Sequence, residues 1–385
     1  LRLSYGSNGN QAISAYQTLD RLSAVKKYLF GDEATPVNGV YLPTNGVGNP
    51  NLKWETTNTF NAGLDYSFLN GRLLGSFDFY VSNTKDLLMS RSVPYMNGYR
   101  SIMDNIGSTR NIGLEFVLTS VNIRNKDFEW RTTFNLAWNK DEITKLADNA
   151  TQDLTNKWFV GESSRVYYDY NVVGTWQTNE ATWDATKKKY INADGKEIQK
   201  GAVPGSAKLE DVNGDGVIDS NDKKVIGSKL PSITSALTNN FAYKNVYASF
   251  VLTGLFGQWR QMHDYNFDRW MPEFNYLSGM NYWTEDNPTN EMTSPVYVPF
   301  NKHGFYKRMN YVHIKNVTLG YRLPKEWANS LGLQSIKCDL SVNNLYTFSN
   351  IKNALNFDST QDDEKGAVIG YRTARSYMFT LNVSF

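Results

Sequence analysis

The chain has 385 residues, and its 40 Lys and Arg residues almost balance its 38 Asp and Glu residues, so the formal net charge is only +2. This balance argues against a nucleic-acid-binding protein, which would carry a clustered excess of basic residues. No apolar run approaches the ~18 residues that a transmembrane helix needs, which excludes a helical membrane protein. A membrane β-barrel stays open, because its alternating strands average out to a polar composition.

The cysteine count and the first residues of the chain bear on the class of protein and on its processing. The single cysteine, Cys338, excludes a disulfide framework and a cysteine-based zinc site. The chain opens on Leu1 with neither an initiating methionine nor a signal-peptide pattern. We therefore expect a processed or truncated start with further domains upstream.

Alternation of apolar and polar residues with period two is the dominant pattern along the chain. Helical periodicity is confined to Ile13–Phe30 and Glu326–Leu331. The alternation predicts about ten strands, at 1–6, 58–68, 73–81, 111–121, 128–139, 232–243, 246–257, 310–323, 335–348 and 374–385.

The connections between these strands alternate in length. Short links lie at 69–71, 122–126, 244–245 and 324–334, and long ones at 7–51, 86–110, 141–231, 258–309 and 349–373. Short turns on one side and long loops on the other are typical of outer-membrane barrels. The strands also match the ~9–11 tilted residues that cross a bilayer, whereas sandwich strands run to ~5–6 residues. The sequence thus predicts an all-β fold, a transmembrane antiparallel β-barrel with long extracellular loops.

The end of the chain is consistent with this topology. If the short turns are periplasmic, the last strand ends in the periplasm on Phe385. This requires that 141–231 is one extracellular excursion, so the strand-like segment Val166–Trp176 must not cross the membrane. Aromatic residues near the strand ends fit an interfacial girdle: Trp54, Trp130, Trp138, Tyr243, Tyr321 and Tyr346. Cys338 alternates with apolar residues and is expected to face lipid. A soluble β-sandwich with aromatic cores is the alternative.

The strongest local motif is an acidic loop at 211–222. Oxygen-bearing side chains stand at relative positions 1, 3, 5, 9 and 12, Gly216 stands at position 6, and position 7 offers its backbone carbonyl, which is the spacing of a Ca²⁺-binding loop. We therefore predict a structural Ca²⁺ site that fixes a long extracellular loop, against the alternative of an Asx-rich turn without an ion. The predicted ligands are Asp211, Asn213, Asp215, Val217, Asp219 and Asp222.

A second feature is the aromatic-rich loop 258–309, in which Trp and Tyr residues are mixed with Asp, Glu and Asn. Aromatic faces stack on the C–H faces of sugars, while neighbouring polar groups bind the hydroxyls, so Trp259, Trp270 and Trp283 are candidate substrate-binding residues. The alternative is that these rings pack the loop or contact a partner protein.

No catalytic constellation stands out. His263, His303 and His313 lack metal-ligand spacing, and no nucleophile elbow, P-loop or dinucleotide-binding glycine pattern occurs. We expect no enzyme activity. Asp78, Glu115, Arg131 and Arg322 lie at inward-facing positions and are expected to form part of the polar barrel lining.

Several motifs together resemble the SusC-like TonB-dependent transporters of the Bacteroidetes outer membrane. They are the opening Arg2–Asn10, the Pro-Asn-Leu-Lys-Trp-Glu run at 50–55, the paired Asn-x-Gly motifs at 105–107 and 111–113, and the acidic loop followed by Gly227 and Pro231. They run through the whole chain in the order that the family shows.

The resemblance implies that 1–385 is the C-terminal part of a 22-stranded, plugged barrel, with the plug domain absent from this chain. It further implies TonB-dependent import of a nutrient, most often glycan oligosaccharides and otherwise peptides, across the outer membrane of a Gram-negative bacterium. The implied partners are a SusD-like lipoprotein that closes over 141–231 and 258–309, TonB through the missing N-terminal part, and membrane lipid or lipopolysaccharide. A dimer of the transporter–lipoprotein pair is also compatible with it.

Two other functional classes stay open on the sequence alone. One is a passive pore or adhesin that forms a complete barrel of about ten strands. The other is a secreted carbohydrate-binding module whose acidic loop holds Ca²⁺.

Overall fold

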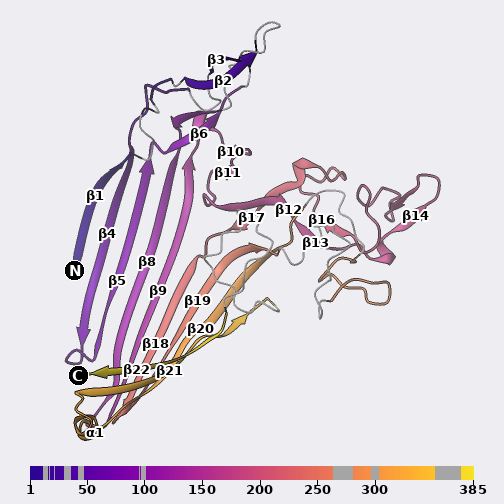
Figure 1. The fold of residues 1–385 in the computed structure, drawn as a ribbon. Coiled ribbons are helices and arrows are strands. Elements are labelled where there is room, and N and C mark those ends of the chain that lie inside the picture. The colour runs from indigo at the N-terminus through magenta and orange to yellow at the C-terminus, as the bar shows by residue number, and fades with distance from the viewer. Residues whose placement is uncertain are drawn as a thin grey trace. The chain divides into compact units, whose positions relative to one another are not determined.

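Among the residues that the structure describes, the main sheet contains ten strands in chain order, and Figure 1 shows them side by side. The computed structural model describes residues 1–11, 16, 18–20, 22–29, 36–41, 47–94, 96, 101–262, 281–295, 303–351 and 374–385. The strand order is β1-β4-β5-β8-β9-β18-β19-β20-β21-β22. The bounds are β1 (Arg2–Asn10), β4 (Glu55–Phe68), β5 (Leu73–Lys85), β8 (Ser108–Arg124), β9 (Phe128–Lys145), β18 (Ile233–Tyr243), β19 (Val246–Gln261), β20 (Tyr306–Arg322), β21 (Ser335–Ser349) and β22 (Ser376–Ser384). The predicted number and order of the strands are confirmed.

Shorter strands pair in two-stranded sheets within the long connections. These pairs are β2 (Ser23–Leu29) with β3 (Pro36–Tyr41), β6 (Leu88–Ser92) with β7 (Ser101–Asn105), β10 (Gln152–Asp153) with β11 (Trp158–Phe159), β12 (Val166–Tyr170) with β17 (Lys223–Ser228), β13 (Val172–Thr175) with β16 (Ala207–Leu209), and β14 (Thr182–Asp184) with β15 (Lys189–Ile191). The segment 166–176 therefore pairs outside the main sheet, as the proposed topology requires.

The two helical predictions have different outcomes. The helix α1 (Lys325–Ser330) confirms the prediction at Glu326–Leu331 to within one residue. The prediction at Ile13–Phe30 is wrong over Ser23–Leu29, which is a strand; the rest of that segment lies mostly outside the described residues. Pairing with the β-branched residues of β3 outweighs a weak helical periodicity there. Among the described residues, no helix has the length and apolar character needed to span a membrane.

The chain divides into two compact units, which are described separately. Unit 1 comprises Leu1–Val121 with Thr133–Ser164, and unit 2 comprises Asn122–Thr132 with Arg165–Phe385. In unit 1, strand register aligns Phe60 with Val81 and Val81 with Ile112, so these side chains share one apolar face. The opposite face carries Asp78 beside Glu115.

Unit 2 has the same two-sided character. Leu319 lies opposite Leu340, and Leu340 lies opposite Phe379, which forms an apolar face. Cys338 belongs to this face, between Tyr321 and Leu381 in the register, as predicted. The other face is lined by hydroxyl and amide groups, for example the Oγ1 of Thr318, 2.9 Å from the Oγ of Ser341. In a transmembrane barrel the apolar face contacts lipid and the polar face lines the lumen.

One irregularity interrupts β20. Val251 of β19 pairs with Asn316, whereas Leu252 pairs with Ile314, so Lys315 is an extra residue at this point. The register with β21 also shifts between Ile314 and Asn316. This β-bulge changes the parity of the alternation along β20.

Glycine and tyrosine face each other directly across two strand pairs. Tyr80 of β5 lies opposite Gly113 of β8, and Tyr247 of β19 lies opposite Gly320 of β20. A Cβ at either glycine would overlap the facing tyrosine ring. The missing side chain therefore lets each ring lie flat across the neighbouring strand, which fixes the register.

We expect Gly113→Val to destabilise the sheet by about 1–3 kcal/mol, because the added side chain has to displace the Tyr80 ring. Gly6→Ala is the control, since a Cβ at Gly6 would meet no atom within 4 Å. The measurement is the thermal unfolding of the detergent-solubilised protein, followed by heat-modifiable migration on gels. Equal midpoints for the two variants would contradict this account of the pair.

Candidate functional site

The polar face of the sheet carries charged residues that are partnered with one another. In unit 1, the Nε of Arg2 donates to Asp65 at 2.7 Å, and its Nη2 donates to Asp78 at 3.1 Å. In unit 2, the guanidinium of Arg322 lies 5.3 Å from the ring centroid of Tyr247, whose hydroxyl donates to Asp339. These pairs are typical of a wet, polar barrel lining.

The four predicted lining residues thus lie on the expected face, but they do not converge on one centre. Arg131 lies 3.7 Å from Glu129, and Glu115 lies opposite Asp78 in the register. Arg2 in unit 1 and Asp339 in unit 2, neither of which was predicted as a lining residue, are the partners that these charges share. Asp339 alternates with the apolar positions 338 and 340, and this pattern in the sequence could have placed it on the polar face. In the structure it lies opposite Gly320 and Thr380.

The acidic loop is folded by its own carboxylates. The two carboxylate oxygens of Asp211 accept hydrogen bonds from the backbone N–H groups of Gly214 and Gly216, at 2.7 and 2.8 Å. Asp222 is fully buried and accepts from the N–H groups of Val212 and Asp219, at 2.9 and 2.8 Å. Gly214 and Gly216 both have positive φ, which explains why glycine stands at these two positions.

The loop offers oxygen ligands of the kind that Ca²⁺ prefers. Each carboxylate oxygen has two lone pairs, so a single N–H bond leaves capacity for a cation. However, no group of three or more His, Cys, Asp or Glu side chains within the described ranges is close enough to hold a metal ion. Ca²⁺ binding by Asp211, Asn213, Asp215, Val217, Asp219 and Asp222 therefore remains a prediction.

A half-buried ion pair attaches the start of this loop to the small sheets around it. Glu210 accepts a hydrogen bond from the Nδ2 of Asn171 at 2.5 Å and lies 2.7 Å from the Nζ of Lys224 on β17. The bond from Asn171 and then that from Lys224 lower the pKa of the Glu210 carboxyl. Glu210 is therefore ionised over the neutral pH range and holds β12, β16 and β17 together at the loop.

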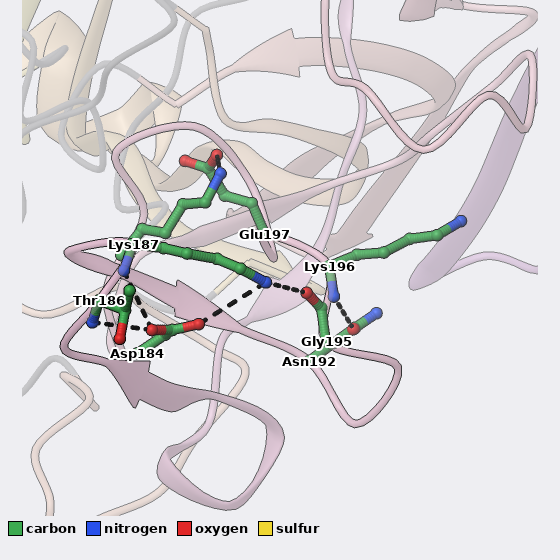
Figure 2. Close-up of polar contacts among 8 residues, drawn as sticks. Asp184, Thr186, Lys187, Asn192, Gly195, Lys196 and Glu197 are labelled. Atoms are coloured by element: carbon green, nitrogen blue, oxygen red, sulfur yellow. Dashed lines mark hydrogen bonds and ion pairs between the residues drawn. The ribbon is translucent and has the colours of Figure 1, made fainter.

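The basic run at 187–189 is built into a hairpin rather than left as a free cationic patch (Figure 2). The Nζ of Lys187 donates to the carbonyl of Gly195 at 3.1 Å and lies 3.6 Å from Asp184. Lys189 pairs with Glu197 at 2.8 Å. The N–H group of Lys187 also donates to Asp184, and this bond is the first cause of that carboxyl's lowered pKa. These charges stabilise the β14–β15 turn.

The three candidate tryptophans have different environments. Trp283 is only 6% exposed, and its Nε1 donates to the Oε1 of Gln177 at 2.8 Å. Trp259 lies on β19 opposite Arg308, and its ring covers Gly227. Trp270 lies outside the described residues. In this conformation Trp283 packs the loop, which favours the packing interpretation for that ring.

A small cavity of about 130 Å³ lies in unit 2, between β13 and the strands around it. Val172–Thr175, Asn290–Thr293 and Phe305–Lys307 line it, together with Asn171. Thr293 is 1% exposed, and its Oγ1 is buried without a hydrogen-bond partner among the residues that the structure describes. A buried hydroxyl without a partner is costly, so a conformation that opens this cavity to a hydrogen-bonding ligand would be stabilised by it. No pattern in the sequence had marked Thr293.

Ten long antiparallel strands, an apolar and a polar face, and alternating short and long connections define a membrane β-barrel protein. Residues 1–219 match the family described as "TonB dependent receptor-like, beta-barrel". The chain therefore belongs to the TonB-dependent receptor β-barrel family, whose members are transporters of the outer membrane.

Curated relatives agree with this assignment. TonB-dependent receptors P26 and P3 of Formosa agariphila are 32% and 31% identical over 91% and 100% of the chain. TonB-dependent receptor SusC of Bacteroides thetaiotaomicron is 30% identical over 85% of the chain. The chain spans 36%, 39% and 32% of the lengths of these relatives, respectively.

A solved structure shows the same fold. The RagAB peptide transporter superposes over 100% of this chain and 40% of its own chain, with a TM-score of 0.74 and 23% identity. The predicted fold class and the predicted resemblance to SusC-like transporters are confirmed.

If the acidic loop binds Ca²⁺, millimolar CaCl₂ should stabilise the folded protein by about 2.7 kcal/mol at 100 times the Kd, because only the folded loop assembles the ligands. The measurement is the thermal midpoint with and without CaCl₂, with MgCl₂ as the parallel condition. Asp211→Asn combined with Asp215→Asn should remove the Ca²⁺-dependent shift, whereas Asp194→Asn, in a separate turn, should keep it. An unchanged midpoint in the unsubstituted protein would leave the loop as an ion-free Asx turn.

Proposed function

We propose that this chain forms the C-terminal part of the barrel of a SusC-like importer, which carries a nutrient across the outer membrane of a Gram-negative bacterium with energy delivered through TonB. The observation that carries the proposal is the family match, joined to a sheet whose polar face is lined by partnered charges and amides. In this proposal the plug and the remaining strands come from an upstream part of the polypeptide, which also contacts TonB. The passive pore or adhesin is the competing class.

The proposed partner is a SusD-like surface lipoprotein that closes over 141–231 and 258–309. The segment 141–231, the proposed extracellular excursion, is folded into small two-stranded sheets and exposes several apolar side chains, which suits a protein-binding surface. These side chains are Val173, Trp183, Val203, Val212 and Val217, each at least 43% exposed. Two such transporter–lipoprotein pairs would form the proposed dimer.

The proposed cargo is a glycan oligosaccharide, with peptides as the second candidate. The cavity around Thr293 would take one hydrogen-bonding group of such a cargo, because it combines a hydroxyl that has no partner among the described residues with Asn171, Asn290 and Phe305. Sugars present hydroxyls and C–H faces together. Trp259 on β19 and Trp270 remain proposed cargo contacts, whereas the buried ring of Trp283 is proposed to pack the loop.

We expect uptake of labelled oligosaccharide by cells that express the complete protein with its lipoprotein partner, and we expect collapse of the proton gradient to abolish it. TonB-coupled transport uses that gradient, whereas diffusion through a pore does not. The measurement is initial uptake with and without a protonophore, for a panel of oligosaccharides and oligopeptides. Uptake that is insensitive to the protonophore would establish a passive pore, and uptake of peptides alone would reassign the cargo.

Thr293→Val should lower the initial uptake rate of the preferred cargo about fivefold at subsaturating concentration, which corresponds to ~1 kcal/mol for one hydrogen bond. Folded stability should not fall, because the Thr293 hydroxyl has no hydrogen-bond partner to lose within the described part of the chain. Thr182→Val, at an exposed position on β14, is the matched control and should leave uptake unchanged. Unchanged uptake in Thr293→Val would remove this cavity from the cargo path.

A further inference from the structure

A polarity gradient follows the apolar face of unit 1 toward the ends of the strands that meet the long connections. The register aligns Phe60 with Val81, then Asn58 with Asn83 one step further, and Lys85 with Ser108 beyond that. Along one face the side chains thus change from apolar to amide to cationic within five residues of β5. The long connections are extracellular in this fold, so the gradient ends at the level of the outer leaflet.

These side chains border a hollow of about 560 Å³. Its apolar floor comes from Tyr5, Phe60 and Val81, and its upper part from Lys85, Arg110 and Lys145 together with amide and hydroxyl groups. The lining residues, all of which belong to the described ranges, include three cations and no carboxylate. A surface that combines an apolar floor with a cationic upper border matches an anionic amphiphile.

The nearest carboxylate neutralises this charge only in part. Glu142 lies 3.8 Å from the Nη1 of Arg110 and closer, at 3.3 Å, to the Nζ of Lys140. The Nε of Arg110 donates to the Oδ1 of Asn83 at 3.0 Å, which fixes the plane of the guanidinium. The four cations Lys85, Arg110, Lys140 and Lys145 against Glu142 leave a local charge of 4 − 1 = +3.

A cationic side chain on the lipid face of a barrel has an energetic cost that depends on its depth in the bilayer. Lys and Arg are costly at the midplane of the bilayer but cost little near its interfaces, where the charged head reaches the polar layer. Clustered basic residues at that level attract anionic headgroups, and a guanidinium binds phosphate oxygens in a bidentate manner. Because three basic residues surround one hollow, the arrangement favours binding of one phosphate group in it over a general attraction to the anionic leaflet.

We propose that the hollow bordered by Lys85, Arg110 and Lys145 binds the phosphate-bearing headgroup of an outer-leaflet glycolipid of the lipopolysaccharide type. The cations bind the phosphate, the amides and hydroxyls of Asn58, Asn83 and Ser108 bind the sugar, and Tyr5, Phe60 and Val81 contact the first methylene groups of the acyl chains. This inference depends on the barrel fold and on the lipid-facing side of unit 1, and not on the identity of the cargo.

The test uses the complete protein, purified in detergent, and measures binding of diphosphorylated lipid A and of lipid A from which both phosphates have been removed. We expect the phosphorylated form to bind more tightly. Substitution of all three cations (Lys85→Ala, Arg110→Ala and Lys145→Ala) should weaken its binding about 100-fold, because each basic residue near an anionic surface contributes on the order of fivefold. Binding should also weaken as ionic strength rises.

The matched control removes three cations from the extracellular excursion (Lys157→Ala, Lys188→Ala and Lys196→Ala) and should bind phosphorylated lipid A as the unsubstituted protein does. Heat-modifiable migration confirms that both triple variants are folded. Lys85→Arg keeps the charge and should retain binding, which separates loss of charge from loss of structure.

Three results would overturn the proposal: equal binding of the two lipid A forms, equal loss in the two triple variants, or full competition by millimolar inorganic phosphate, which would show an anion site without lipid recognition. Cargo uptake by the Lys85, Arg110 and Lys145 variant is measured in parallel. Retained uptake with lost lipid binding is the expected pattern, so a failure of this inference is distinguishable from a failure of the proposed transport function.

Discussion

Hydrocarbon offers no partner for a peptide group, so every strand that crosses a membrane has to satisfy its backbone N–H and C=O groups from the strands beside it. For the strands between β1 and β22, the ten-stranded order meets this demand by antiparallel pairing on both sides. Because successive side chains alternate, the pairing also decides which side chains meet lipid and which meet the lumen. The apolar band, the partnered charges of the polar face and the cationic hollow of unit 1 all depend on that one register.

This dependence explains which features the sequence predicts well. Wherever one face is apolar and the other polar, the contrast is visible in the sequence, and the strands were located within a few residues. The ends were underestimated: β9 was expected to end near 139 and continues to Lys145. In this extension every side chain except Ile143 is polar or charged, so hydrogen bonding lengthens the strand where the apolar–polar alternation has already ended. The strand at Ser23–Leu29 was missed because its alternation is short and its partner is local.

The candidate sites were harder to predict, because they depend on contacts between distant segments. The acidic loop was recognised as a unit, yet the sequence could not show that the carboxylate of Asp222 would be buried on the N–H groups of Val212 and Asp219. Trp283 looked like an exposed stacking surface, and its bond to Gln177 is made across 106 positions of the chain. Thr293 has no local signature at all, since its significance comes from a missing partner in a cavity formed by three separate segments.

The bulge at Lys315 has a consequence for how such barrels diverge. Before it, Ile314 contributes to the lipid face, and after it Val317 does, although three positions separate them. Because Lys315 is an extra residue, apolar side chains lie on the lipid face of β20 both before and after the bulge. A one-residue insertion or deletion within a regular strand would move the lipid-facing side chains beyond it to the lumen face, and the lumen-facing ones to lipid. At this position a length change can be accommodated by adding or removing the bulge, so indels within strands of related barrels should concentrate where such a bulge already exists.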